Sequence, residues 1–162
     1  MPFTGTLLSE FEPERECWHE SGHAVVAQHL GMRVVAIGYA WVRGQDSEPN
    51  PCNWIATDGF DKDIVAIELF AGMAAEVVKL GDYDIGAYRL DVQAWQALGC
   101  GSSTERYINQ TIEILRKRDD RLVRVYDRLM EERTNPSHNP FVDTDNVKRQ
   151  VHLTQEEFES LL

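Results

Sequence analysis

Two histidines and a glutamate in the segment HESGH, residues 19–23, have the types and spacing that bind a catalytic metal ion. Residues four apart in a helix lie about 40° from each other around its axis, so the imidazoles of His19 and His23 can both reach one ion. Imidazole nitrogen is a preferred ligand of zinc, and Glu20 can serve as general base toward a water in an open coordination position. The segment therefore predicts a zinc-dependent hydrolase. The alternative is a pair of half-exposed histidines on an ordinary surface helix.

A third protein ligand has to come from another part of the chain, where five side chains offer a suitable donor: Glu68, Glu76, Asp91, His138 and His152. Asp91 stands out because it shares one face of a predicted helix with Trp95 and Leu98, which are expected to point into the core. A carboxylate that points inward needs a cation or several hydrogen bonds, and a zinc ion supplies the cation. Asp91 is therefore the favoured third ligand. Pairing with Arg89, or a position at the edge of this face, are the alternatives.

Two further carboxylates, Glu76 and Glu68, are expected to orient the ligand histidines. Both belong to a predicted helix that is apolar nearly all round and should therefore lie in the core. A metal-bound histidine commonly donates its other ring N–H to a carboxylate, which fixes the orientation of the ring. Glu76 and Glu68 are assigned this role, with capping of a backbone amide as the alternative.

Helices are expected to carry all of these residues. A capping-box pattern at residues 9–12, followed by Pro13, predicts a helix that contains HESGH and stops at Gly31. A second helix begins at Asp61 or Asp63 and ends before residue 81. After a loop over residues 81–86, a third helix ends near Gly99.

The later part of the chain is expected to be helical as well. A second capping-box pattern at residues 102–105 opens a long helical region to about residue 132, with a break near Asp119. Thr154 and Glu157 are placed to cap a short last helix, in which Leu153 and Phe158 form a hydrophobic staple.

A small sheet is predicted from the alternation of residues 33–43. One face would carry Val35, Ile37, Tyr39 and Trp41, and the other Val34, Ala36, Gly38 and Ala40. Residues 45–53 and 135–139 are predicted loops, and residues 54–57 a short returning strand. The fold class is therefore α+β and predominantly α-helical, with the HESGH helix, a small β-sheet and a C-terminal helical bundle.

Length and charge restrict the class of protein. The chain has 162 residues, 43% of them hydrophobic, which is typical of one domain over residues 1–162, with a core of about residues 9–133 and a C-terminal extension over 134–162. The formal net charge of -11 disfavours nucleic acid and anionic membranes as partners. No apolar run is long enough to span a bilayer, the first ten residues do not form a signal peptide, and the three cysteines make no disulfide framework. These features predict a cytoplasmic protein.

Three segments together resemble the peptidase domain of the FtsH-type protease family. Residues 17–27 resemble its HEAGHA segment, residues 71–76 its GGRAAE helix, and residues 81–91 the segment that delivers its third zinc ligand. The resemblance covers about residues 12–133. The chain departs from the family at Ser21, Ala71 and Met73, and it contains no GxxxxGK[ST] sequence for an ATPase module.

This resemblance implies a mostly helical domain with Zn²⁺ held by His19, His23 and Asp91 and with Glu20 as the catalytic glutamate. It also implies that an edge strand near the site binds an extended polypeptide substrate. That strand would be residues 34–41, with Val35, Ile37 and Tyr39 as substrate-binding residues.

The sequence thus predicts an ATP-independent zinc metalloendopeptidase that hydrolyses peptide bonds. The alternative is a non-catalytic zinc-binding regulatory or adaptor module derived from the same peptidase domain. Retention of Glu20 favours the enzyme, because a structural zinc site has no use for a general base. A homo-oligomer or a separate ATPase chain is left open as a partner.

Overall fold

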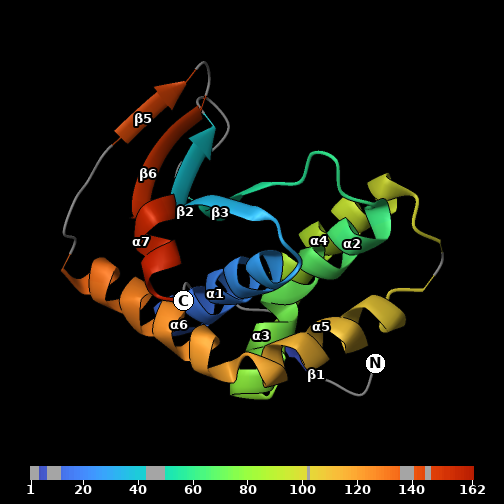
Figure 1. Cartoon of the computed structure of the whole chain (residues 1–162). Helices are drawn as coiled ribbons and strands as arrows, with labels where there is room; N and C mark the ends of the chain where they lie inside the picture. The colour runs from blue at the N-terminus through green and yellow to red at the C-terminus, as the bar shows by residue number, and fades with distance from the viewer. Residues whose placement is uncertain (1–3, 7–11, 43–49, 102, 136–140, 145–146) are drawn as a thin grey trace.

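Seven helices and two small sheets make up the described part of this computed structural model, which covers residues 4–6, 12–42, 50–101, 103–135, 141–144 and 147–162 (Figure 1). The helices are α1 (Pro13–His29), α2 (Lys62–Leu69), α3 (Ala71–Leu80), α4 (Ile85–Leu98), α5 (Glu105–Lys117), α6 (Asp119–Thr134) and α7 (Gln155–Ser160). The strands are β1 (Thr4–Thr6), β2 (Arg33–Val42), β3 (Asn50–Ala56), β4 (Asp82–Asp84), β5 (Phe141–Thr144) and β6 (Val147–Thr154). The predicted class, α+β and predominantly helical, is confirmed.

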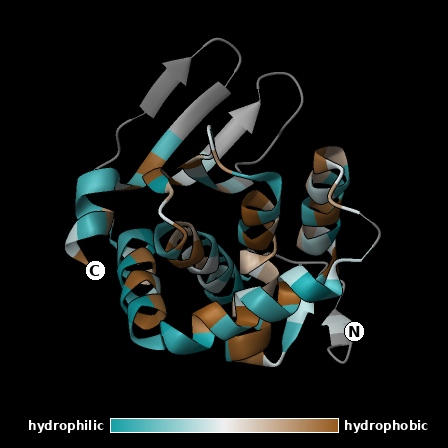
Figure 2. Ribbon diagram, turned by 45° about the vertical axis from the view of Figure 1, so that its right-hand side comes forward, coloured by the Kyte–Doolittle hydropathy of each residue, from teal (hydrophilic) through white to brown (hydrophobic). Residues whose placement is uncertain are grey.

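The helix α1 lies at the centre of the molecule, below the larger sheet and against α3 and α6 (Figure 1). It is buried on most sides, because small and β-branched residues from Ala24 to Ala27 let neighbouring helices approach closely. Figure 2 shows the hydrophobic residues of the helices turned toward one another and the hydrophilic ones on the outer faces. None of the helices in the described ranges has both the length and the apolar character for a membrane crossing.

The ends of α1 agree with the prediction only in part. The helix begins at Pro13, and its N-cap is Glu12, whose side chain makes no capping hydrogen bond. The predicted capping box begins at Ser9, which lies outside the described residues. At the other end Leu30 is the C-cap, and Gly31 follows with a φ of 82°, a left-handed conformation that favours glycine and stops the helix as predicted.

The larger sheet has the strand order β3-β2-β6-β5, with antiparallel neighbours, so β2 is an interior strand. The prediction that residues 34–41 form a peptide-binding edge is therefore wrong, because β6, which the sequence analysis did not expect, covers the second side of β2. Gly38 permits this pairing, since a Cβ at that position would overlap the carbonyl oxygen of Gln150. The edge strand next to α1 is β3.

The predicted alternation along β2 is also wrong. The register shifts between Val34 and Ala36 against β3, and between Ile37 and Gly38 against β6. Such irregularities re-aim side chains. As a result Ile37 is 1% exposed and Val35 is 41% exposed, although both were assigned to one face.

The predicted helix over residues 61–80 is broken at Phe70, where α2 ends and α3 begins. No glycine or proline marks this break. Two carbonyl groups near the end of α2 find partners from other elements: the Thr111 hydroxyl donates to Ile67 O at 2.8 Å, and the His23 ring to Glu68 O at 3.2 Å. Because these carbonyls are satisfied, the chain can turn here and bring α3 against α1.

Two of the predicted loops contain a strand, and helix α5 begins differently from the prediction. Strand β3 begins at Asn50, inside the predicted loop, whose residues 45–49 lie outside the described part. Strand β4 lies inside the predicted 81–86 loop and pairs in parallel with β1. Helix α5 begins after Thr104 without a side-chain cap, and Ser102 of the predicted box is not described. Of the predicted 135–139 loop, residues 136–139 are likewise outside the described residues.

The C-terminal segment is part of the same fold. The break between α5 and α6 falls at Arg118, next to its predicted position. Thr154 and Glu157 form the predicted capping box of α7, and Leu153 and Phe158 are buried beside it. Because β6 lies between β2 and β5, residues 134–162 are not a simple extension of the core but supply an interior strand of the sheet.

Candidate metal centre

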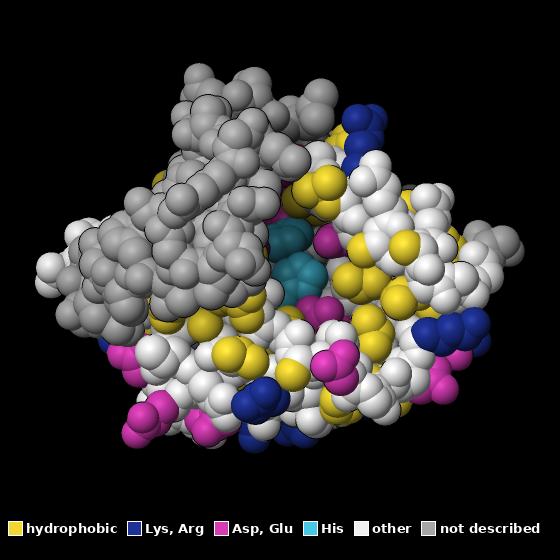
Figure 3. Space-filling view, turned by 90° about the horizontal axis from the view of Figure 1, so that it is seen from above, with side chains coloured by type: hydrophobic (Ala, Val, Ile, Leu, Met, Phe, Trp, Pro, Cys, Tyr) yellow, Lys and Arg dark blue, Asp and Glu magenta, His cyan; other side chains and the backbone are white. Residues whose placement is uncertain are grey.

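Three side chains from two helices meet at one point. Ligand atoms of His19 and His23 on α1 and of Asp91 on α4 all lie within 4.8 Å of one another. The two Nε2 atoms are 3.2 Å apart. Two nitrogen ligands of a tetrahedral zinc ion are separated by roughly 3.3 Å, so the imidazoles already have a suitable spacing. Figure 3 shows histidine side chains at the bottom of a hollow, flanked by acidic side chains.

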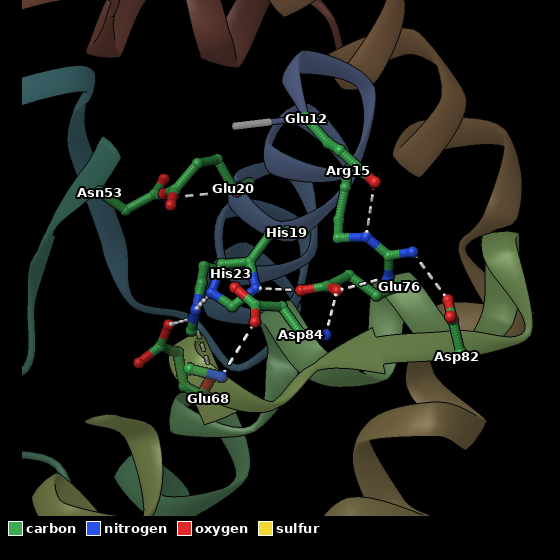
Figure 4. Close-up of polar contacts among 11 residues, drawn as sticks. Glu12, Arg15, His19, Glu20, His23, Asn53, Glu68, Glu76, Asp82 and Asp84 are labelled. Carbon is green, nitrogen blue, oxygen red and sulfur yellow. Dashed lines mark hydrogen bonds and ion pairs between the residues drawn. The ribbon is translucent and has the colours of Figure 1, made fainter. Parts of the chain in front are cut away.

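Each imidazole is held by a carboxylate on its other nitrogen. Nδ1 of His19 donates to Glu76 Oε1 at 2.6 Å, and Nδ1 of His23 donates to Glu68 Oε1 at 2.8 Å (Figure 4). An ionised carboxylate only accepts hydrogen bonds, so the ring proton sits on Nδ1. Nε2 of each ring is therefore the atom left to bind a shared cation, once any proton on it is displaced. Both carboxylates predicted to orient the ligands thus make the contacts which that role requires.

Arg15 was missed by the sequence analysis. Its guanidinium donates to Glu76 Oε2 at 3.0 Å and to Asp82 at 2.8 Å, and the backbone N–H of Asp84 also donates to Glu76 Oε2 at 2.8 Å (Figure 4). Glu76 is only 1% exposed, and a carboxylate so deeply buried needs such partners to stay ionised. The available signal was position, because Arg15 lies one helical turn before His19 on α1.

Asp91 carries a buried oxygen that lacks a partner. Its Oδ2 makes no hydrogen bond within the described part of the chain. Burial raises the pKa of this carboxyl to about 6, while the nearby His23 and His19 act in the opposite direction. Arg89, the alternative partner, is exposed. Native proteins rarely leave a buried acceptor unpaired, so an oxygen in this position beside two imidazoles fits a bound cation.

The other predicted site residues lie elsewhere. His152 is buried with its ring 4.9 Å from that of Tyr39, outside the metal cluster, and His138 lies outside the described residues. The proposed substrate residues Val35, Ile37 and Tyr39 do not line the cleft that contains the histidines. Their assignment followed from taking β2 as an edge strand.

The cleft around the histidines has a volume of about 610 Å³. Strand β3 lines one side with Pro51, Cys52 and Asn53, and α4 lines the other with Ala87 and Leu90. Among the described residues, seven carboxylates line it against one arginine, which produces a negative potential that favours a cation. Strand β3 borders the cleft with an edge of the sheet.

Two tryptophans that could have walled this cleft belong to the core instead. Trp18 stacks on Tyr126 with ring centroids 3.5 Å apart, on the side of α1 that faces α6. Trp95 is buried, with its ring centroid 6.2 Å from that of Phe70. Neither lines the cleft. Their role is packing in the core.

Glu20 lies in the cleft beside the histidines without joining the metal cluster. It is 7% exposed, and the side-chain amide of Asn53 donates to its carboxylate (Figure 4). Glu20 therefore lies beside the cluster of His19, His23 and Asp91 and is not one of its members. Asn53 falls in a predicted loop, and nothing in the sequence marks it as a site residue.

Gly72 on α3 provides the space for the His19 ring, because a Cβ at this position would overlap that ring. The ring cannot move aside without losing its hydrogen bond to Glu76. We expect Gly72→Ala to destabilise the protein by about 1–3 kcal/mol and to weaken metal binding at least about tenfold. Chemical denaturation and a metal-competition titration measure both effects.

Gly86→Ala is the matched control for this substitution, since a Cβ there would meet nothing closer than an Asp84 carboxylate oxygen at 3.3 Å. Gly86→Ala should change neither the stability of the protein nor its metal affinity substantially. Equal effects of the two substitutions would show that Gly72 has no special relation to His19.

Metal binding should depend steeply on pH. Burial lowers the pKa of His23, but the charge and hydrogen bond of Glu68 outweigh it and raise the pKa to about 10. Burial lowers the pKa of His19 too, but the hydrogen bond to Glu76 and the charges of Asp91 and Glu20 together raise it above its usual range. Without metal the His23 ring is therefore protonated at neutral pH, and a metal ion has to displace its proton.

Because protons compete with the metal ion for the imidazole nitrogen, the apparent metal affinity should fall as the pH is lowered from about 9 to about 6. The expected fall is about tenfold per pH unit for each proton displaced. Competition with a zinc chelator at several pH values measures the slope, and calorimetry in buffers of different ionisation enthalpy counts the protons released. An affinity that stays constant over this range would contradict the protonated state of the metal-free site.

Comparison of the sequence with models of known protein families gives no match, and neither does comparison with curated proteins.

Proposed function

We propose that this protein is a zinc-dependent metallopeptidase that hydrolyses peptide bonds without ATP. The proposal depends on one arrangement of side chains. The imidazoles of His19 and His23, each hydrogen-bonded to a carboxylate, lie close to a buried Asp91 oxygen that has no hydrogen-bond partner in the described part of the chain. A separate glutamate, Glu20, lies beside them in the same cleft. A structural zinc site normally has four protein ligands, whereas three ligands and a neighbouring base are typical of catalytic sites.

The donor set supports zinc in particular. His19 and His23 would supply nitrogen and Asp91 a carboxylate oxygen, a mixture that suits zinc better than the oxygen-preferring magnesium or calcium. Bound there, zinc would supply Lewis acidity toward a peptide carbonyl.

The chain's own residues would handle the proton. Glu20 takes a proton from the attacking water as the new C–O bond forms, and then gives a proton to the amine nitrogen as the C–N bond breaks. Glu68 and Glu76 hold the imidazoles, while Arg15 holds Glu76. The proton is therefore moved by one residue, and three others maintain the geometry around it.

The proposed substrate is an extended polypeptide that lies along β3 in the cleft. The edge position of β3 supports this, because a free strand edge can pair with a substrate backbone. The resemblance of residues 12–133 to FtsH-type peptidase domains belongs to the same proposal. So does a cytoplasmic location, which the three free cysteines support.

Cleavage of casein, an unfolded protein, tests the proposal. We expect the zinc-loaded protein to cut casein, a chelator to abolish cleavage, and added zinc to restore it. A protein that binds zinc but leaves casein intact would overturn the proposal in favour of a regulatory zinc-binding module. A protein that cuts equally well after complete metal removal would overturn it too.

A further inference from the structure

Asn53 lies in the middle of β3, opposite Ile37 of the interior strand β2. Within the described part of the chain, β3 has a strand partner on one side only. The Asn53 side chain lines the same cleft as His19, His23 and Asp91. It therefore lies between the edge strand of the sheet and the proposed metal site.

The contacts of Asn53 determine which way its amide is turned. Nδ2 donates to the Glu20 carboxylate and, at 3.0 Å, to the Glu20 backbone oxygen. Both partners only accept hydrogen bonds, so the NH₂ group has to face Glu20. The amide oxygen is consequently on the side of the amide group that does not contact Glu20.

That oxygen, Oδ1, is buried and has no hydrogen-bond partner. Within the described residues only three buried side-chain atoms lack a partner, and the side chains that carry two of them, Asn53 and Asp91, line this cleft. Asp91 Oδ2 is accounted for by a cation. Asn53 Oδ1 needs a donor instead, because an amide oxygen has no charge to balance and accepts N–H or O–H groups.

We infer that Asn53 has two roles in the proposed peptidase: its NH₂ group positions Glu20, and its oxygen accepts a hydrogen bond from a backbone N–H of the bound substrate. This inference rests on the proposed function. It makes Asn53 a specificity residue for amide chains, since an ester at the same position lacks the donor. Because one amide group makes both contacts, binding of the substrate along β3 also helps to position the Glu20 carboxylate.

Two substitutions separate these roles. Asn53→Asp keeps an acceptor and loses the donor to Glu20, whereas Asn53→Ala loses both. We expect Asn53→Asp to lower kcat about 10- to 100-fold with little change in KM, and Asn53→Ala to lower kcat and raise KM. Zinc content should stay close to wild type in both, whereas thermal stability should stay close to wild type in Asn53→Ala and fall in Asn53→Asp, in which a second carboxylate faces Glu20. Asn109→Asp and Asn109→Ala, the same substitutions at an exposed position of α5, are the controls and should leave both constants unchanged.

A series of substrate analogues tests the acceptor directly. One casein peptide that the wild type cuts once is made with each backbone N–H, except that of the cut bond, replaced in turn by an ester oxygen. One replacement should lower kcat/KM at least about tenfold in the wild type and in Asn53→Asp, but have no effect in Asn53→Ala. The same loss in Asn53→Ala as in the wild type would overturn the acceptor role. An unchanged kcat in Asn53→Asp would overturn the positioning role.

Failure of the proposed function would look different. If the zinc-loaded wild type cuts no peptide, the peptidase proposal falls, and binding then decides the role of Asn53. A fluorescent casein peptide and its ester analogues are titrated onto zinc-loaded Glu20→Gln protein, with and without Asn53→Ala. The acceptor role predicts that one ester binds at least about tenfold more weakly only when Asn53 is present. Equal binding of all analogues would overturn it.

Discussion

Replacing Glu20 with glutamine is expected to lower the rate of peptide hydrolysis at least about a thousandfold while the protein keeps its zinc. General acid–base catalysis by a positioned side chain contributes about 10²- to 10⁴-fold, and the glutamine amide cannot take a proton from water. Glutamine has nearly the same shape, and its oxygen can still accept the hydrogen bond from Asn53. Because Glu20 lies outside the cluster of His19, His23 and Asp91, metal affinity should not change.

Casein cleavage and metal content measured on the same samples check this result. Glu14→Gln is the matched control: it is the same substitution on the same helix at an exposed position, and it should remain fully active. Full activity in Glu20→Gln would overturn the assigned base. Loss of zinc together with activity would instead place Glu20 among the ligands.

The local part of the site could be predicted because one helix carries it. The spacing of His19 and His23 depends only on helical geometry, and Pro13 and Gly31 delimit that helix. The positions of Asp91, Glu76 and Glu68 were inferred from acidic residues in otherwise apolar helices, which have to be compensated when buried.

What could not be predicted depends on contacts between distant segments. Strand β6 covers β2 although more than a hundred residues separate the two, so the true edge strand, and with it Asn53, could not be identified from the alternation of β2 alone. The break at Phe70 likewise depends on Thr111, which satisfies a carbonyl of α2 from another helix. Periodicity describes a single element and contains no information on which element lies beside it.

Replacing Asp91 with asparagine is expected to have opposite effects on metal binding and on the stability of the metal-free protein. Metal affinity should fall at least about a hundredfold, because the amide oxygen is neutral and a much poorer ligand than a carboxylate. Hydrolysis should fall with it at limiting zinc. The metal-free variant should be more stable than the metal-free wild type at neutral pH, because the substitution removes a buried charge.

The direction of this change in stability follows from the pKa of Asp91, which burial raises from 3.8 to about 6. A carboxyl with a raised pKa contributes full stability below pH 3.8 and loses it as the pH rises through about 6. The difference corresponds to about 3 kcal/mol of unfolding free energy in the metal-free state, an upper value because the solvent and the nearby His23 relax around the charge.

Denaturant unfolding of the metal-free proteins at about pH 4 and about pH 7 measures this contribution, which the asparagine variant should lack. Asp127→Asn, exposed on α6, removes the same charge from the net -11 and should change neither affinity nor stability. If Asp91→Asn kept wild-type zinc affinity, the third ligand would have to be another residue. If Asp91→Asn also left the stability of the metal-free protein unchanged, the Asp91 carboxylate would not be destabilised by its burial. Burial of this carboxylate would then give no reason to expect a bound cation.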